Sequence, residues 1–127
     1  MLLKNEFSIQ IMKQDNVGVS LAPLNDKINL TACLHFGGCT LLESNGYWND
    51  GGKLYNDDSY RLVIAFNRDE KTLDYLLNLV KMELVGGKQE SVCFTLDGKT
   101  SISSSIDEAR DDLNALLTTV RRGRRVG

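Results

Sequence analysis

An apolar stripe between two strand-like segments limits most strongly how this chain folds. The stripe repeats at helical spacing and consists of Leu73, Leu76, Leu77, Val80 and Leu84. The segments 60–66 and 92–96 on either side alternate between apolar and other residues, which predicts strands. A helix and strands that each have one apolar face bury those faces by packing together. The sequence therefore predicts a sheet covered by helices.

Further elements follow from periodicity and turn residues. Alternation over 7–12 predicts a first strand, and 40–43 predicts another. Gly46 and the pair Gly51-Gly52 are interpreted as turns that interrupt this second strand. The stretch 17–21 is either a short strand or part of a loop.

Two helices and a hairpin are placed by their end signals. A short helix is predicted to begin with Asn25 or Asp26 as its cap and to end at Gly37-Gly38. The striped helix is capped by Asn67 or Asp69 and ends at Gly86-Gly87. Asp97-Gly98 predicts a turn that returns the chain along 99–102.

The last element is a helix with a clear start. Ser105 and Glu108 match a capping box, and Gly123 is the expected stop. Its apolar stripe is Ile106, Ala109, Leu113, Leu116, Leu117 and Val120. This stripe covers either its own sheet or that of a neighbouring subunit. The fold prediction is α+β, a ferredoxin-like sandwich of a mainly antiparallel sheet with two substantial helices, the second a C-terminal addition, in one domain over 1–127.

Composition excludes several classes of protein. The net charge of −2 does not favour a nucleic acid polymer as partner. Three cysteines and one histidine, without a metal-type spacing, argue against a disulfide framework and a zinc site. This use of cysteine favours a reducing, intracellular setting. No apolar segment reaches the length of a membrane span or a signal peptide. No cofactor or metal is expected.

The sequence shows no obvious catalytic set. Cys33 and His35 are two residues apart in an apolar stretch, whereas a nucleophile and its base usually come from separate elements. The carboxylates of Asp57-Asp58 and Asp111-Asp112 are adjacent and point in different directions. We therefore expect no enzyme.

The run from Phe36 to Tyr55 carries a resemblance to known proteins. Its matching positions are Gly37, Gly38, Thr40, Gly46, Trp48 and the Gly51-Gly52 turn. Asp57 or Asp58 stands where the pattern has glutamate. About half the chain resembles a group of small phage and bacterial proteins, and in size and element order it is similar to the first Thoeris anti-defence family. The resemblance implies an oligomeric phage protein in the host bacterial cytosol, a sponge that sequesters cyclic ADP-ribose isomers and, in some members, cyclic oligonucleotides.

Eight residues are candidates for holding such a ligand. They are Trp48, Tyr60, Arg61, Thr95, Lys99, Arg110, Arg121 and Arg122. Aromatic rings stack on bases, and one guanidinium group donates hydrogen bonds to two phosphate oxygens at once. Each group also has a structural explanation. Trp48 packs beneath the glycine turn, the arginines complement the helix C-terminus or pair locally, and Thr95 and Lys99 belong to a solvated hairpin.

Two other functions compete with the sponge. An oligomeric protein-interaction or structural module would use the stripe of the last helix for assembly and bind no small molecule. A small hydrolase acting on a nucleotide would need a catalytic constellation that the sequence does not display.

Overall fold

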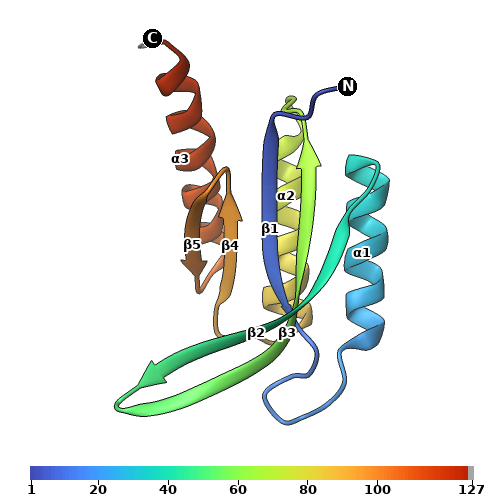
Figure 1. The fold of residues 1–127 in the computed structure, drawn as a ribbon, viewed down its shortest axis with the longest axis vertical. Coiled ribbons are helices and arrows are strands. Elements are labelled where there is room, and N and C mark those ends of the chain that lie inside the picture. Colours follow the sequence, from blue (N-terminus) through green and yellow to red (C-terminus); the bar gives the residue numbers. More distant parts are fainter. Residues whose placement is uncertain (126–127) are drawn as a thin grey trace.

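The computed structural model describes the backbone of residues 1–125 and the side chains of residues 1–118 (Figure 1). Its elements run in the order β1 (Asn5–Met12), α1 (Ala22–Phe36), β2 (Thr40–Asp50), β3 (Lys53–Phe66), α2 (Thr72–Lys81), a π-helical turn (Met82–Gly86), β4 (Val92–Leu96), β5 (Lys99–Ser103) and α3 (Ile106–Arg125). No helix in this described part is long and apolar enough to cross a membrane.

The strands form one antiparallel sheet in the order β2-β3-β1-β4-β5. The first four strands and the helices between them have the ferredoxin-like order, and β5 is added as a hairpin with β4. The predicted α+β class is therefore confirmed. The sequence predicted each of the alternating segments that meet at the centre of the sheet.

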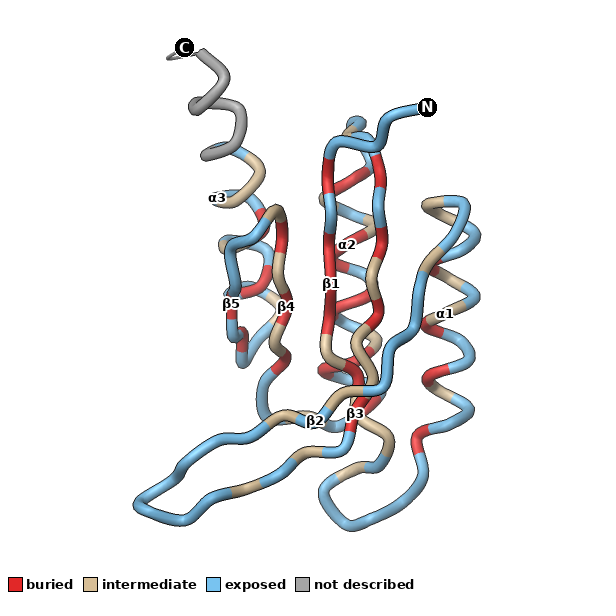
Figure 2. Tube along the Cα trace, in the orientation of Figure 1, coloured by how far each residue is buried: buried red, intermediate tan, exposed pale blue. Residues whose placement is uncertain are grey.

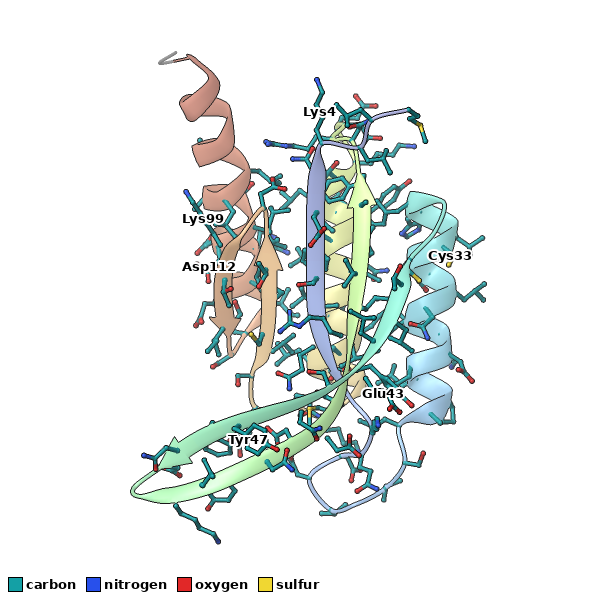
Figure 3. All side chains as sticks on the ribbon, viewed as in Figure 1. Lys4, Cys33, Glu43, Tyr47, Lys99 and Asp112 are labelled. Carbon is teal, nitrogen blue, oxygen red and sulfur yellow. The ribbon has the colours of Figure 1, made fainter. Side chains whose placement is uncertain are left out.

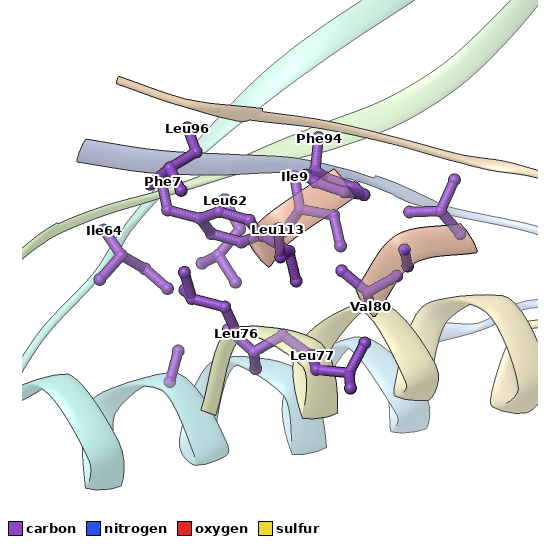
Figure 4. Close-up of a cluster of buried hydrophobic side chains, with 14 of the residues drawn as sticks. Phe7, Ile9, Leu62, Ile64, Leu76, Leu77, Val80, Phe94, Leu96 and Leu113 are labelled. Carbon is purple, nitrogen blue, oxygen red and sulfur yellow. The ribbon is translucent and has the colours of Figure 1, made fainter. Parts of the chain in front are cut away.

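The core lies between the sheet and the helices (Figure 2). Figure 4 shows side chains from β1, β3 and β4 meeting those of α2 and α3. Phe7 and Phe94 come from neighbouring strands, with ring centroids 5.9 Å apart. Leu76 and Leu113, from the two predicted stripes, are fully buried against them. Burial of these apolar side chains is the main stabilisation of the sandwich.

The opposite face of the sheet is not covered by a helix. Ser8, Gln10 and Arg61 alternate with the core residues and point to this open face. Ile102 there is 66% exposed. Antiparallel sheets tolerate one face in contact with water when that face is largely polar.

Helix α1 is longer than the predicted short helix and starts earlier. It begins at Ala22, with Pro23 in its first turn, where a missing amide hydrogen does no harm. Asn25 is therefore not the cap; it is buried, and its side chain donates to the carbonyl of Met12. The predicted end is confirmed, because Gly37 has φ 85° and its amide donates to Cys33 O. The region 17–21 is a loop with a single bridge from Gln14 to Ser20.

Strands β2 and β3 extend well beyond the body as a hairpin, here called the arm (residues 46–57), which Figure 1 shows projecting away from the helices. Gly51 and Gly52 form the predicted turn, both with positive φ, as two-residue hairpins require. The prediction for Gly46 is wrong. It lies inside β2 opposite Asp57. A Cβ at this position would come 2.7 Å from Gln10 Nε2, so the glycine leaves room for the Gln10 side chain.

Helix α3 starts as predicted, and Ser105 Oγ accepts a hydrogen bond from the Glu108 amide at 3.1 Å. Its buried residues Ala109 and Leu113 pack on α2 and β5 of the same chain. The helix therefore covers its own sheet, one of the two alternatives. The expected stop at Gly123 is wrong, since the helix continues to Arg125.

Candidate functional site

A polar cleft lies where the β1–α1 loop meets α1, the start of β2 and the middle of β3. Its volume is about 340 Å³, within the range of small-molecule pockets. We call it the Tyr60 cleft. It is lined by Lys13, Gln14, Ser20, Ala22, Asn25, Asp26, Asn29, Leu41, Asp58 and Tyr60. Segments far apart in the sequence thus supply one aromatic ring, one cation, two carboxylates and three amides.

Lys13 is the electrostatic centre of the cleft. Its Nζ lies 3.0 Å from Asp58 Oδ1 and 3.4 Å from Glu43 Oε1, and 4.8 Å from the centroid of the Tyr60 ring. The hydrogen bond to Asp58 raises the pKa of Lys13, burial opposes this shift, and the bond to Glu43 adds to it. The lysine is therefore a cation at neutral pH, held over an aromatic face by two carboxylates.

Two amide oxygens beside the cleft accept no hydrogen bond from any described residue. They are Oδ1 of Asn25 and Oδ1 of Asn29, both buried. A buried acceptor without a donor costs about 1–3 kcal/mol. The cleft is therefore suited to a ligand or solvent that supplies donors to these asparagines.

Glu83 lies in the π-helical turn behind the cleft and is 1% exposed. Its Oε2 accepts a hydrogen bond from the Met12 amide at 2.9 Å. The carbonyl oxygen of Met12 in turn accepts a hydrogen bond from the side-chain amide of Asn25. Burial raises the pKa of Glu83 to about 7, against the effect of the Met12 hydrogen bond. π-helical turns occur often at functional sites. Through this hydrogen bond, the carboxyl group of Glu83 holds the backbone of Met12, the residue before Lys13, in place.

Sequence reasoning missed Glu83, although a signal was present. The residue stands three positions after Val80, on the buried side of the predicted stripe. A carboxylate at such a position is rarely buried without a purpose or a partner.

Of the six predicted ligand residues whose side chains the structure describes, Tyr60 alone lies in this cleft. Trp48 lies in the arm, where it stacks on Tyr55 with centroids 4.4 Å apart and donates from Nε1 to Asp57 at 3.0 Å. It is 47% exposed, so the alternative that it is core beneath the glycine turn is wrong.

Arg61 and Thr95 come near each other on the open face. Arg61 donates to Ser8 Oγ at 2.8 Å, and Ser8 is the register partner of Thr95. Thr95 in turn bonds the Thr100 hydroxyl at 2.8 Å. Both predicted residues thus have partners within the sheet.

The remaining predicted residues lie elsewhere. Lys99 begins β5, and Figure 3 shows it on the opposite side of β1 from Glu43, which pairs with Lys13. Arg110 pairs with Asp107 at 3.1 Å on α3, one of the local alternatives considered for it. The side chains of Arg121 and Arg122 lie outside the described residues. The structure does not bring the predicted set into one site.

Two larger clefts, each of about 700 Å³, offer a less definite chemistry. One lies between the start of α2 and α3, with Lys4 and Arg68 among its residues. The other is bordered by the end of α1, by Phe66 and by Tyr75. No group of three or more potential metal ligands occurs among the residues that the structure describes.

Comparison with known proteins points to one fold relationship. No protein-family model matches the chain, and no curated protein matches it. A phage SAM lyase in its apo state has TM-score 0.61 and 14% identity, over 80% of this chain and 89% of that chain. A phage SAM lyase in complex with S-methyl-5'-thioadenosine has TM-score 0.60 and 13% identity, over 83% and 97%. At these identities the likeness shows a shared fold.

These structures correct the functional expectation. The sequence analysis predicted a protein that sequesters cyclic nucleotides, and it predicted that the protein is not an enzyme. Both are wrong, because two solved structures that share this fold are those of a phage SAM lyase, which is an enzyme. The resemblance of residues 36 to about 102 to the small phage and bacterial proteins, and the similarity to the anti-defence family, are not tested by them and stay predictions.

Proposed function

We propose that this protein is an enzyme that binds S-adenosylmethionine and cleaves it as a lyase, with S-methyl-5'-thioadenosine as one product. The observation that carries the proposal is the match to a SAM lyase with S-methyl-5'-thioadenosine bound, which extends over 97% of that chain. A phage enzyme of this kind would act in the cytosol of the host bacterium.

The Tyr60 cleft offers the chemistry that such a substrate needs. Adenine is flat and stacks on an aromatic ring such as that of Tyr60. Its amino group is a donor, and the buried amide oxygen of Asn29, which accepts from no described residue, would accept from it after a rotation of that side chain. The sulfonium and ammonium groups are cations, which the carboxylates of Asp26 and Asp58 attract. Lys13, by moving from Asp58, would meet the carboxylate of the substrate.

The bond to be broken explains why the cleft contains no evident general acid. When a carbon–sulfur bond of a sulfonium breaks, the bonding pair stays on sulfur and the leaving group is a neutral thioether, while an oxygen of the substrate's own carboxylate bonds to the released carbon and closes a lactone. That leaving group needs no proton. The protein then contributes mainly by holding the substrate in a reactive conformation and limiting access of water.

The test is an assay of S-adenosylmethionine consumption by mass spectrometry. We expect S-methyl-5'-thioadenosine to form with wild-type protein. Tyr60→Ala should lower kcat/KM by roughly 10-fold or more, because stacking on one ring is worth about 1–3 kcal/mol. Tyr60→Phe keeps the ring and should retain most activity. Arg110→Ala, on exposed α3, is the matched control and should behave as wild type.

Two outcomes would contradict the proposal in different ways. Absence of both product and a thermal shift with S-adenosylmethionine would reject the lyase. If the Tyr60→Ala variant forms product as fast as wild type, the reaction does not take place in the Tyr60 cleft.

We also propose that the protein assembles into a homo-oligomer. The arm exposes Tyr47 and Leu54 by 64% and 69%, and α1 exposes Leu34 by 75%. Exposed apolar side chains of this number favour association. Light scattering after size exclusion tests this, and a monomer at all concentrations would refute it.

A further inference from the structure

Two cysteines face each other across the turn that ends α1. The Sγ atoms of Cys33 and Cys39 are 3.5 Å apart. Cys33 is exposed, and Figure 3 labels it near the end of α1. Cys39 is half-buried, and its thiol also approaches the carbonyl of Asn29 at 3.9 Å. A disulfide has its sulfurs about 2.0 Å apart, so the two thiols would have to move closer for the bond to form.

The backbone holds the two thiols in this relation. The Gly37 amide donates to Cys33 O at 2.9 Å and closes the last turn of α1. Gly37 has φ 85°, and β2 begins at Thr40. The short connection therefore fixes both cysteines relative to each other without a separate ordering step.

The environments of the two thiols differ. Burial, followed by the hydrogen bond with Cys33, raises the pKa of Cys39 to about 11. Because the thiolate is the reactive form and Cys33 is the exposed member, Cys33 reacts first with an external reagent. Cys39 is then the resolving thiol.

We propose that Cys33 and Cys39 form a reversible disulfide switch that exchanges with low-molecular-weight disulfides such as oxidised glutathione. The thiolate of Cys33 attacks one sulfur of the reagent, forming a mixed disulfide and releasing one glutathione thiolate. Cys39 then loses its proton to solvent and attacks the Cys33 sulfur, releasing the second glutathione. The two protein thiols are oxidised, and the reagent is reduced to two thiols.

Oxidation would tie α1 to the edge strand β2. This helix leaves Leu30 and Leu34 largely exposed, and only Ile28 and Ala32 of its apolar residues are fully buried. The cross-link restricts the unfolded chain and joins two elements at the end of the helix. The thiol of Cys39 would also lose its contact with Asn29, a residue of the Tyr60 cleft.

The experiment is oxidation of the folded protein with oxidised glutathione, followed by alkylation and peptide mapping. We expect alkylated cysteines to fall from three to one, with Cys93 the reactive residue that remains and a peptide cross-linked between Cys33 and Cys39. The thermal midpoint should rise by roughly 5 °C and return on reduction.

Matched variants separate the steps. Cys93→Ser should form the same cross-link and show the same shift. Cys39→Ser should stop at a stable mixed disulfide on Cys33, with no rise in the thermal midpoint. A wild-type protein that keeps three alkylatable thiols, or a cross-link that includes Cys93, would overturn the proposal. Cross-linking without a rise in the midpoint would overturn the link between oxidation and α1.

Discussion

The arm continues two strands of the sandwich body, but the arm and the body are held together in different ways. In the body, β3 lies between β1 and β2 and turns Leu62 and Ile64 to the helices, where both are fully buried. In the arm, β2 and β3 pair with each other, and Trp48 and Leu54 remain substantially exposed. A two-stranded ribbon is marginally stable in water by itself. The arm therefore depends on turn geometry and cross-strand pairs, whereas the body depends on a core.

This difference implies that the free energy of unfolding is concentrated in the body. Substitutions should then act strongly beneath the helices, moderately where arm and body meet, and weakly within the arm. The four variants below test this order.

The largest effect is expected for Phe94→Ala. Phe94 is fully buried on β4 and packs on Phe7, so truncation leaves a cavity that costs about 3–5 kcal/mol. Urea unfolding measures the loss. Phe94→Leu, which fills more of the space, should lose much less. A loss below about 1 kcal/mol for the alanine variant would contradict the assigned core.

Glu83 should give the body a stability that falls as pH rises. Its pKa is about 7 when folded, above the ordinary value of 4.5, so the folded state holds the proton more tightly. Its stabilising contribution is full below pH 4.5 and is lost as pH rises through 7, at most ~3 kcal/mol. Urea unfolding of wild type and Glu83→Gln from pH 4 to pH 8 measures the difference.

Gln at position 83 keeps an acceptor for the Met12 amide and does not titrate. The stability of the variant relative to wild type should therefore increase across this pH range. Parallel stability profiles for the two proteins would show that Glu83 does not titrate as its burial indicates.

Gly46→Ala probes the junction of arm and body. The added methyl group meets Gln10 Nε2, which donates to the buried Ser59 hydroxyl at 3.1 Å. Displacing Gln10 should cost about 1 kcal/mol in equilibrium unfolding. The comparison is made in a double-mutant cycle with Gln10→Ala, where the alanine at 46 should be tolerated. An equal cost in both backgrounds would exclude the clash as the cause.

The smallest effect is expected for Trp48→Ala in the arm. The residue loses its stack on Tyr55 and its bond to Asp57, but both lie outside the core. The free energy of global unfolding, measured by urea titration with circular dichroism as the probe, should change by less than about 1 kcal/mol. A loss as large as that of Phe94→Ala would mean that the arm unfolds together with the body.

The same contrast explains what the sequence could predict. Alternation and helical stripes revealed the core, because apolar side chains such as Phe94 and Leu76 must be buried whichever way the elements are arranged. Gly46 was interpreted as a turn, since nothing local announces that Gln10, far away in the sequence, occupies the space of its missing side chain. The start of α1 was misplaced because exposed Leu30 and Leu34 blur its apolar face, and Pro23 was the better signal.

The candidate site was less predictable than the fold. Tyr60 was chosen for its ring, but its partners Lys13 and Asn25 reach it through strand pairing and the β1–α1 loop. Such long-range placement is set by the whole topology and not by local spacing. Trp48 and Arg61, chosen on the same chemical grounds, lie on other surfaces.

The central place of β1 in the sheet has a consequence for synthesis of the chain. Phe7 pairs with Ile64 on one side and with Leu96 on the other, so its partners emerge from the ribosome much later. Until then, the apolar side of the first strand has no sheet to join. A topology dominated by such distant pairings folds slowly and exposes this strand to wrong associations in the meantime. β1 is thus vulnerable until β3 and β4 have followed it, although its core residues Phe7, Ile9 and Ile11 are fully buried in the finished protein.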